Sequence, residues 1–288
     1  MHDKSMKRKN AVILTGGGMR CAYSAGALVA LAEQVRLVEP DILIAASGSA
    51  GSSAYYLSKQ YDKGKKIWLS ELTNPKFISF DRFHIIDIDY LIDEVFRAHN
   101  PFDLSALHAN RTQWMLPLTR TRDGETVWVE PPRDERVYEY LRAAKAIPFV
   151  YGKPVSIDNE EYLDGEFGCR TEDYVHKAAH EGAERILVIE SNPGTDFQVE
   201  RRAFARLLLA EAQSRGHAGI VAAAERGLSH RVSPISKDVQ VITIAPSQKL
   251  DIGPVTHDSF DLREAFNLGY EDITTNEAIR NWFAGDAQ

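Results

Sequence analysis

The stretch "ILIAASGSAGSSAYYL" at residues 42–57 leads from four apolar residues into a cluster of very small ones. A short apolar run of this kind is typical of a strand buried in a parallel sheet, and helical periodicity follows it as far as Lys59. A sharp turn between a strand and a helix can expose a serine hydroxyl, and its neighbours must be small because the turn is strained and crowded. Ser49 lies between Gly48 and Ala50, so we expect it to be a nucleophile at the centre of the turn.

The same turn allows an interpretation without chemistry. Serine caps helices well, so the segment could be a Ser- and Gly-rich helix cap. Ser47, Ser52 and Ser53 are poorer candidates for the nucleophile than Ser49, because we do not expect any of them to be centred on the turn. The helix expected to start at Ser49 would place its N-terminal amides and its dipole where they favour an oxyanion.

A second glycine-rich loop follows another short apolar strand. The segment "ILTGGGMRCAYSAGAL" at residues 13–28 comes out of a strand expected over Ala11–Thr15. The dinucleotide-binding pattern G-x-G-x-x-G is incomplete, because Cys21 stands at the third glycine, and the sequence has no G-x-x-x-x-G-K-[ST] motif. We therefore expect Gly17 and Gly18 to offer bare N–H groups to an oxyanion rather than to a nucleotide.

The alternation of strands and helices predicts βαβ units and a mainly parallel sheet. We expect a disordered basic N-terminus over residues 1–10 and a single domain over 11–288. Two hairpins are expected, one over residues 114–130 and one over 154–165, and Pro117 favours an edge position for the first strand. The other expected elements are helices at 88–97, 134–146, 172–181, 201–226 and 262–283, and strands at 185–190 and 239–245.

The composition narrows the class of protein. The 288 residues are 44% hydrophobic and 26% charged, as in ordinary soluble globular proteins, and the net charge of -7 argues against a nucleic-acid partner. Two cysteines, Cys21 and Cys169, are too few for a disulfide scaffold, so we expect a reducing, cytoplasmic location. Since the sequence shows neither a secretory signal nor an apolar run of about 18 residues, we expect no membrane-spanning helix.

Four motifs in order along the chain resemble those of the patatin-like phospholipases, in particular the single-domain bacterial group. One glycine loop would be weak evidence, but four motifs at plausible spacing over nearly the whole chain are specific. A late segment is also similar to one in that group. The segments are "GGGMR" (16–20), "SGSAG" (47–51), "AAKAIPFVYGKPVSID" (143–158), "YLDGEF" (162–167) and the late "FNLGYED" (266–272).

The resemblance implies a three-layer α/β/α fold with a mainly parallel central sheet and a Ser–Asp catalytic dyad. Carried onto this sequence, Ser49 is the nucleophile and Asp164 is the base that accepts its proton. The implied reaction is hydrolysis of a lipid acyl ester, of the phospholipase A type, without a metal or an organic cofactor. The implied partners are the lipid substrate and, through peripheral contact, the inner surface of a membrane.

The resemblance also implies which backbone groups hold the oxyanion. Arg20 matches an arginine that follows the glycines, where it would either contact substrate or fix the loop. Two residues depart from the family's pattern: Ser47 replaces the usual first glycine of the turn, and Glu166 stands where a small residue is usual. A carboxylate beside Asp164 would raise the pKa of Asp164. The implied oxyanion donors are Gly16, Gly17, Gly18 and Ala50.

Two other functions stay open. A catalytically weak or inactive lipid-binding regulatory protein is compatible with the departures at Ser47 and Glu166. A Ser-His-Asp carboxylesterase is compatible with the residue order, because five histidines follow Asp164. These histidines are His176, His180, His217, His230 and His257.

Two further segments suggest sites of other kinds. His176 and His180 have the i, i+4 spacing of metal ligands, but Lys177 stands where the metalloprotease motif has glutamate, so we expect a solvated helix face. The segment "RRAFARLLLAEA" at 201–212 combines arginines with leucines. It could be a membrane-surface helix or a lid, although we favour a helix that faces the core.

Overall fold

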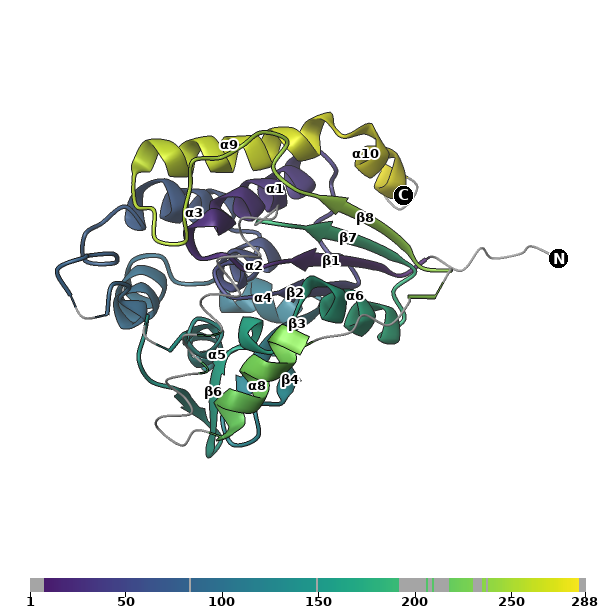
Figure 1. Cartoon of the computed structure of the whole chain (residues 1–288). Coiled ribbons are helices and arrows are strands. Elements are labelled where there is room, and N and C mark those ends of the chain that lie inside the picture. Colours follow the sequence, from purple (N-terminus) through teal and green to yellow (C-terminus); the bar gives the residue numbers. More distant parts are fainter. Residues whose placement is uncertain are drawn as a thin grey trace.

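The protein is built around one mixed sheet with helices on both faces (Figure 1). The computed structural model describes residues 8–82, 84–148, 150–191, 206, 209, 218–229, 235–236 and 238–284. Within them, eight strands lie in the order β5-β6-β3-β2-β1-β7-β8, with β4 beside β3. The strands are β1 (Asn10–Leu14), β2 (Ile42–Ala45), β3 (Gln113–Arg120), β4 (Thr126–Val129), β5 (Val155–Ile157), β6 (Glu160–Asp164), β7 (Arg185–Ile189) and β8 (Gln240–Ile244).

The helices surround this sheet, and several short helical segments connect them. Segments η1 (Gly18–Cys21) and η4 (Gly165–Phe167) are 3-10 turns, whereas η2 (Ile67–Glu71) and η3 (Tyr90–His99) are π-helical. The helices are α1 (Ala22–Glu33), α2 (Ser49–Leu57), α3 (Tyr61–Lys66), α4 (Leu104–Ala109), α5 (Val137–Ala143), α6 (Thr171–His180), α8 (Ala218–Ser229), α9 (Ser259–Thr275) and α10 (Glu277–Ala284).

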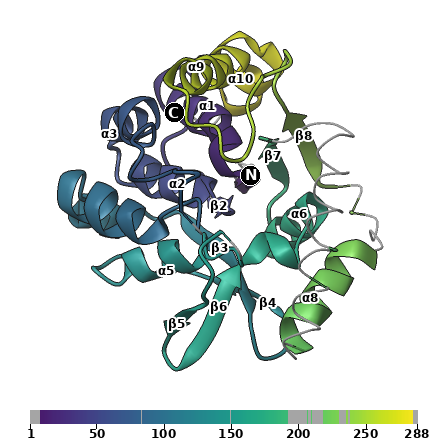
Figure 2. The ribbon, with the colours of Figure 1, turned by 60° about the vertical axis from the view of Figure 1, so that its left-hand side comes forward.

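The parallel part of the sheet consists of β3, β2, β1, β7 and β8. Every residue of β1 and β2 is buried, which requires that both faces of the sheet be covered. Val12 and Leu14 pack into the larger apolar cluster with α1, α2 and α9, whereas Ala11 and Ile13 pack with residues of α6 on the other face. The predicted three-layer α/β/α fold with a mainly parallel sheet is therefore confirmed (Figure 2).

Antiparallel strands extend this sheet at one end, and both predicted hairpins are present. β3 pairs with β4, and β5 pairs with β6 through the turn at Asp158 and Asn159. The φ angles of these two residues are 50° and 66°, the left-handed conformations that a two-residue hairpin turn requires. The second hairpin carries Asp164 as the last residue of β6.

The prediction that Pro117 puts β3 at an edge is wrong. β3 pairs with β2 as far as Met115, then with β6 from Leu118, and with β4 on its other side. Arg120 donates its N–H to β4, so the alternation of the antiparallel ladder turns the nitrogen of Pro117 to the opposite side. That nitrogen faces the short gap between the pairing with β2 and the pairing with β6, where no N–H is needed.

The expected disordered N-terminus over residues 1–10 and the expected segment at 201–212 are only partly covered by the described residues. Lys9 and Asn10 are ordered, because Asn10 starts β1 and Lys9 Nζ donates to the carbonyl of Glu181 at 2.7 Å. Residues 1–7, and residues 201–212 except positions 206 and 209, lie outside the described part of the chain. Among the residues that are described, no helix is long and apolar enough to cross a membrane.

The helices α1 and α9 cross with their backbones nearly in contact. A Cβ atom at Gly26 would lie 1.9 Å from the carbonyl oxygen of Phe266, and one at Gly269 would lie 2.0 Å from that of Tyr23. Only glycine allows an approach this close at both positions. The crossing fixes α1, which begins directly after the glycine-rich loop and η1.

We expect Gly26→Val to lower the free energy of unfolding by about 1–3 kcal/mol or more, because the new side chain forces the two backbones apart. Urea denaturation followed by circular dichroism measures this effect. Gly253→Ala is the matched control, since its Cβ would meet only the Thr256 hydroxyl at an ordinary 3.6 Å. Equal midpoints for the two variants would contradict the role of the crossing.

Candidate active site

The turn between β2 and α2 has its apex at Ser47. β2 ends at Ala45 and α2 begins at Ser49, so Ser49 already belongs to the helix. Ser47 has a φ angle of 50°, in the left-handed region that residues other than glycine rarely adopt. Such a conformation costs on the order of 1–3 kcal/mol and is often found at functional sites. The strained serine of the turn is therefore Ser47.

Ser49 points into the core instead. The residue is 0% exposed, and its Oγ donates to the carbonyl oxygen of Thr15 at 2.8 Å. It also shares a hydrogen bond of 2.9 Å with Ser24 Oγ on α1. The expectation that Ser49 is the exposed centre of the turn is wrong, because its hydroxyl ties α2 to the strand end before the glycine-rich loop.

Ser47 lines a pocket whose wall is mostly apolar. Gly18, Gly48 and Lys145 are near Ser47 in this wall, and η2 and η3 contribute large apolar side chains. Neither Ser49 nor Asp164 is among the residues that line the described pocket. A pocket of this composition suits a hydrocarbon chain with its polar end at Ser47. The apolar residues from or beside η2 and η3 are Ile67, Trp68, Leu72, Ile88, Leu91 and Phe96.

Asp164 lies at the end of β6 and is 1% exposed. Its Oδ1 accepts a hydrogen bond from the Glu166 N–H at 3.0 Å, whereas its Oδ2 is buried without a hydrogen-bond partner in the described structure. Burial raises the pKa of Asp164 well above its ordinary value, and the nearby Glu166 carboxylate raises it further. The Ser47 hydroxyl and the Lys145 ammonium act in the opposite direction on this pKa. The structure therefore brings Asp164 together with Ser47 and not with Ser49.

The glycine-rich loop approaches the same turn. Gly17 and Gly18 have φ angles of 148° and 61°, which direct the backbone around the end of β1. A Cβ at Gly48 would lie 2.6 Å from the carbonyl oxygen of Gly18, so the two turns pack closely. Within the described residues, the N–H groups of Gly17, Gly18 and Gly48 donate to no other group of the protein. They are the backbone donors available beside Ser47.

Two of the four expected oxyanion donors are engaged elsewhere. The Gly16 N–H donates to Glu166 Oε1 at 2.8 Å, and the Ala50 N–H donates to the Ser47 carbonyl at 3.1 Å. The expectation that Ala50 is a donor was tied to Ser49 as the nucleophile, and in the structure its N–H is engaged in the first turn of α2. Gly48 follows Ser47 directly and takes the corresponding position.

Two ionisable residues near the turn, Lys145 and Cys21, were not among the site residues expected from the sequence. Lys145 is 6% exposed, and its Nζ donates to the Ser47 carbonyl at 3.2 Å. Burial lowers the pKa of Lys145 to about 8, although the Asp164 carboxylate raises it. Cys21 lies beside Ser49, and burial raises the pKa of its thiol to about 12, so it is not a thiolate near neutral pH.

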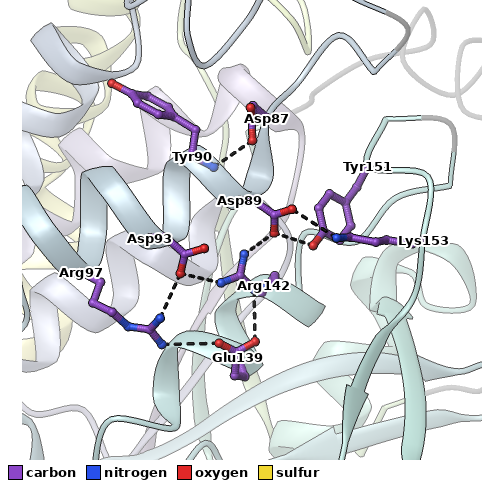
Figure 3. Close-up of polar contacts among 9 residues, drawn as sticks. All are labelled: Asp87, Asp89, Tyr90, Asp93, Arg97, Glu139, Arg142, Tyr151 and Lys153. Atoms are coloured by element: carbon purple, nitrogen blue, oxygen red, sulfur yellow. Dashed lines mark hydrogen bonds and ion pairs between the residues drawn. The ribbon is translucent and has the colours of Figure 1, made fainter.

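A cluster of charged side chains fixes the segment that carries Lys145 (Figure 3). Arg142, on α5, is nearly buried and binds Asp89, Asp93 at 2.8 Å and Glu139 at 3.1 Å. Asp93 also accepts from Arg97 at 2.9 Å, within η3. The cluster ties η3 to α5 three residues before Lys145, so it holds one wall of the pocket against the base of the site.

Arg20 and three of the five histidines that follow Asp164 can be placed in the described structure. Arg20 Nε donates to the carbonyl of Ile252 at 3.0 Å, which anchors the glycine-rich loop to the segment before α9. His176 and His180 belong to α6, on the other face of the sheet, and the His180 side chain is 84% exposed. His257 packs against the Phe80 ring at a centroid distance of 5.8 Å. His217 and His230 lie outside the described residues.

The sequence also contained a signal for Ser47. The G-x-S-x-G pattern favours Ser49, because Gly51 lies two residues after it, but small residues surround Ser47 as well. Ser47 is the second residue after the end of β2 at Ala45. Its neighbours Ala46 and Gly48 are both small, and so is Ser49 two positions later. A turn with small residues at these positions satisfies the steric requirement without glycine at every one. Lys145 offered no such signal, because lysine side chains are almost never fully buried.

Comparison with known proteins identifies the family of the chain. The family model described as patatin-like phospholipase matches residues 12–168, more than half of the chain. The chain belongs to the patatin-like phospholipase family. The matched range includes the glycine-rich loop, the turn at Ser47 and Asp164. At the level of the family, this membership supports a lipid acyl hydrolase.

Individual relatives are distant. The chain is 25% identical over 190 residues to the uncharacterized protein YjjU of Escherichia coli (strain K12), with 64% of this chain covered. It spans about half of that protein, 52% of its length. Among solved structures, VipD from Legionella pneumophila matches with a TM-score of 0.47 at 12% identity, over 96% of this chain and 67% of VipD. Human GIVD cytosolic phospholipase A2 matches with a TM-score of 0.46 at 13% identity, over 99% and 60% of the two chains.

We expect Ser49→Ala to lower the free energy of unfolding by about 1–3 kcal/mol, because it removes a buried hydrogen bond to Thr15. Ser47→Ala, the matched control two residues away, should change stability by no more than about 0.5 kcal/mol, since that hydroxyl is not part of the core network. Chemical denaturation of both variants measures the difference. A larger loss for Ser47→Ala than for Ser49→Ala would contradict the assignment of Ser49 as the structural serine.

Proposed function

We propose that the chain is a lipid acyl-ester hydrolase in which Ser47 is the nucleophile and Asp164 is its base. One observation carries the proposal: Ser47 is held in a strained left-handed conformation at an apolar pocket, beside the buried Asp164 carboxyl. A nucleophile needs access to substrate and a base close by. Ser47 is only 5% exposed, but it lines the pocket, and its hydroxyl acts on the pKa of Asp164. Family membership supports the same class of reaction.

In the first half of the reaction, Ser47 Oγ attacks the ester carbonyl carbon and its proton passes to Asp164 Oδ2. That oxygen accepts no hydrogen bond from the described residues, so it is available for the proton. Because the pKa of Asp164 is raised toward the working pH, the carboxylate is a better base than an exposed aspartate. The oxyanion forms beside the N–H groups of Gly17, Gly18 and Gly48, which are already in place.

In the second half, the tetrahedral intermediate collapses and the alcohol leaves with the proton held by Asp164. The acyl group stays on Ser47 with its chain along the apolar wall of the pocket. Water then attacks the acyl carbonyl while Asp164 accepts its proton. The second tetrahedral intermediate collapses with cleavage of the bond to Ser47 Oγ, Asp164 returns the proton to that oxygen, and the free carboxylic acid is released. The apolar wall favours the hydrocarbon of an acyl chain, so we propose a phospholipid, the phospholipase A type of substrate.

One observation keeps a second function in view. The Glu166 carboxylate accepts the Gly16 N–H inside the glycine-rich loop, where a bound oxyanion would bring a second negative charge. Repulsion between these charges would slow turnover, as expected for a weak enzyme or a lipid-binding protein without activity. Covalent labelling separates this case from an active hydrolase.

We expect an active-site fluorophosphonate to form one adduct, on Ser47. The adduct should be absent from Ser47→Ala and retained in Ser49→Ala, because only the first variant loses the hydroxyl at the pocket. Intact-mass and peptide analysis of the labelled proteins measures this outcome. An adduct that survives Ser47→Ala and disappears in Ser49→Ala would show that Ser49 is the nucleophile, and the absence of any adduct would favour the inactive binder.

Replacing the proposed base gives an independent test. Asp164→Asn should reduce kcat for ester hydrolysis by about 10²–10⁴, because general-base catalysis contributes that much, while the thermal melt stays cooperative. Asp123→Asn changes the other Asp-Gly pair of the chain, at an exposed turn, and should leave kcat unchanged.

The histidines distinguish this dyad from a Ser-His-Asp triad. His217→Gln and His230→Gln, at the two positions outside the described residues, should leave kcat within about tenfold of wild type. A loss for either variant as large as that for Ser47→Ala would favour the triad and refute Asp164 as the direct base.

A further inference from the structure

Lys145 is an ammonium group buried against the proposed nucleophile. Of its three possible donors, one is used, to the Ser47 carbonyl at 3.2 Å, and no other acceptor for it occurs within the described part of the chain. The residue lines the pocket with Ser47, among mostly apolar neighbours. A buried charge with unused donors is costly unless an opposite charge faces it. Asp164 is buried close by, because its N–H donates to the carbonyl oxygen of Ala146, the residue after Lys145, at 3.1 Å. At this range Lys145 and Asp164 each shift the pKa of the other toward its charged form.

A second carboxylate, that of Glu166, has the opposite effect on the pKa of Asp164. Glu166 follows two residues later, and its own N–H binds Asp164 Oδ1 at 3.0 Å. Its carboxylate is held by the Gly16 N–H at 2.8 Å. This negative charge raises the pKa of Asp164, whereas Lys145 lowers it. Asp164 is therefore under the influence of one positive and one negative side chain, each of which is held by a hydrogen bond of its own.

We propose that Lys145 is a positioning residue, which opposes Glu166 and keeps the Asp164 carboxyl ionised so that it can accept the proton of Ser47. The inference rests on the proposed function and adds a residue to it. Lys145 arrives from the end of α5, Glu166 from η4 and Ser47 from the turn after β2. The described ionisable groups close to Asp164 are Lys145 and Glu166, and both of these also interact electrostatically with the thiol of Cys21.

The two charges predict pH effects of opposite sign. Activity requires ionised Asp164, so kcat/KM falls on the acid side as this group takes up a proton. Without the Lys145 ammonium the carboxylate is less favoured, and the acid limb of the profile moves to higher pH. Without the Glu166 charge the carboxylate is more favoured, and the limb moves to lower pH. A charge at close range shifts a carboxyl group by about 1–3 pH units.

The test is the pH dependence of kcat/KM for ester hydrolysis, together with the pH dependence of fluorophosphonate labelling at Ser47. We expect Lys145→Met to move the acid limb to higher pH by about one unit or more, and Glu166→Gln to move it to lower pH by a similar amount. Lys145→Arg retains the charge and should keep the limb close to that of wild type. Lys177→Met removes a lysine charge on α6, on the other face of the sheet, and should not move the limb.

A Lys145→Met variant with lower activity at every pH but an unmoved limb would overturn the inference, because lost packing would explain it. If this variant does not fold, Lys145→Gln replaces it, and an unmoved limb again overturns the inference. Limbs that move in the same direction in Lys145→Met and Glu166→Gln would also refute it. These outcomes differ from failure of the proposed function, in which Ser47→Ala retains its labelling and activity.

Discussion

The close packing of two strand-to-helix turns is the constraint on which the rest of the site depends. The turn after β1 and the turn after β2 meet where Gly18 faces Gly48, at a distance that leaves no room for a Cβ atom. Ser49 stabilises this contact through its hydrogen bond to Thr15, the residue at which the first turn begins. Because parallel strands end at the same edge of the sheet, both turns deliver backbone N–H groups to one point. The strained conformation of Ser47 directs its side chain toward that same point.

The buried charges of the site depend on this frame and on one another. Asp164 has almost no exposure, and burial of this kind favours the neutral form of a carboxyl group unless a positive charge or hydrogen bonds stabilise the charged form. Lys145 is buried as well, and its position follows from the end of α5, which the Arg142 cluster ties to η3. The same cluster holds the apolar wall of the pocket. In the proposed function, substrate binding and the ionisation of Asp164 are thus linked through one polar network at the edge of the core.

Much of the fold and part of the site could be predicted from local patterns. Short apolar runs at β1, β2 and β7, separated by helical periodicity, specify a parallel sheet covered on both faces. The Asp158-Asn159 turn specifies the hairpin that brings Asp164 to the sheet, because these residues tolerate left-handed backbone. Glu166 was recognisable as a charge that would act on Asp164, since it is only two residues away. Pro117 was misplaced, because a gap between two partner strands accepts a missing N–H as well as a sheet edge does.

The sequence by itself determined the elements, the two small-residue turns and the carboxylate at the end of β6, because each depends on residues close together in the chain. Only the tertiary structure decided which serine faces the pocket. Ser47 and Ser49 are two residues apart, and their hydroxyls point in different directions because the backbone reverses its φ angle between them. It also decided that Lys145 is buried in the segment that binds the backbone of Asp164, since this depends on how α5, β6 and the turn after β2 pack. Burial, and the distances between charges on segments far apart in the chain, leave no local pattern in the sequence. The shifted pKa of Asp164, the proposed base, is therefore a property of the folded chain.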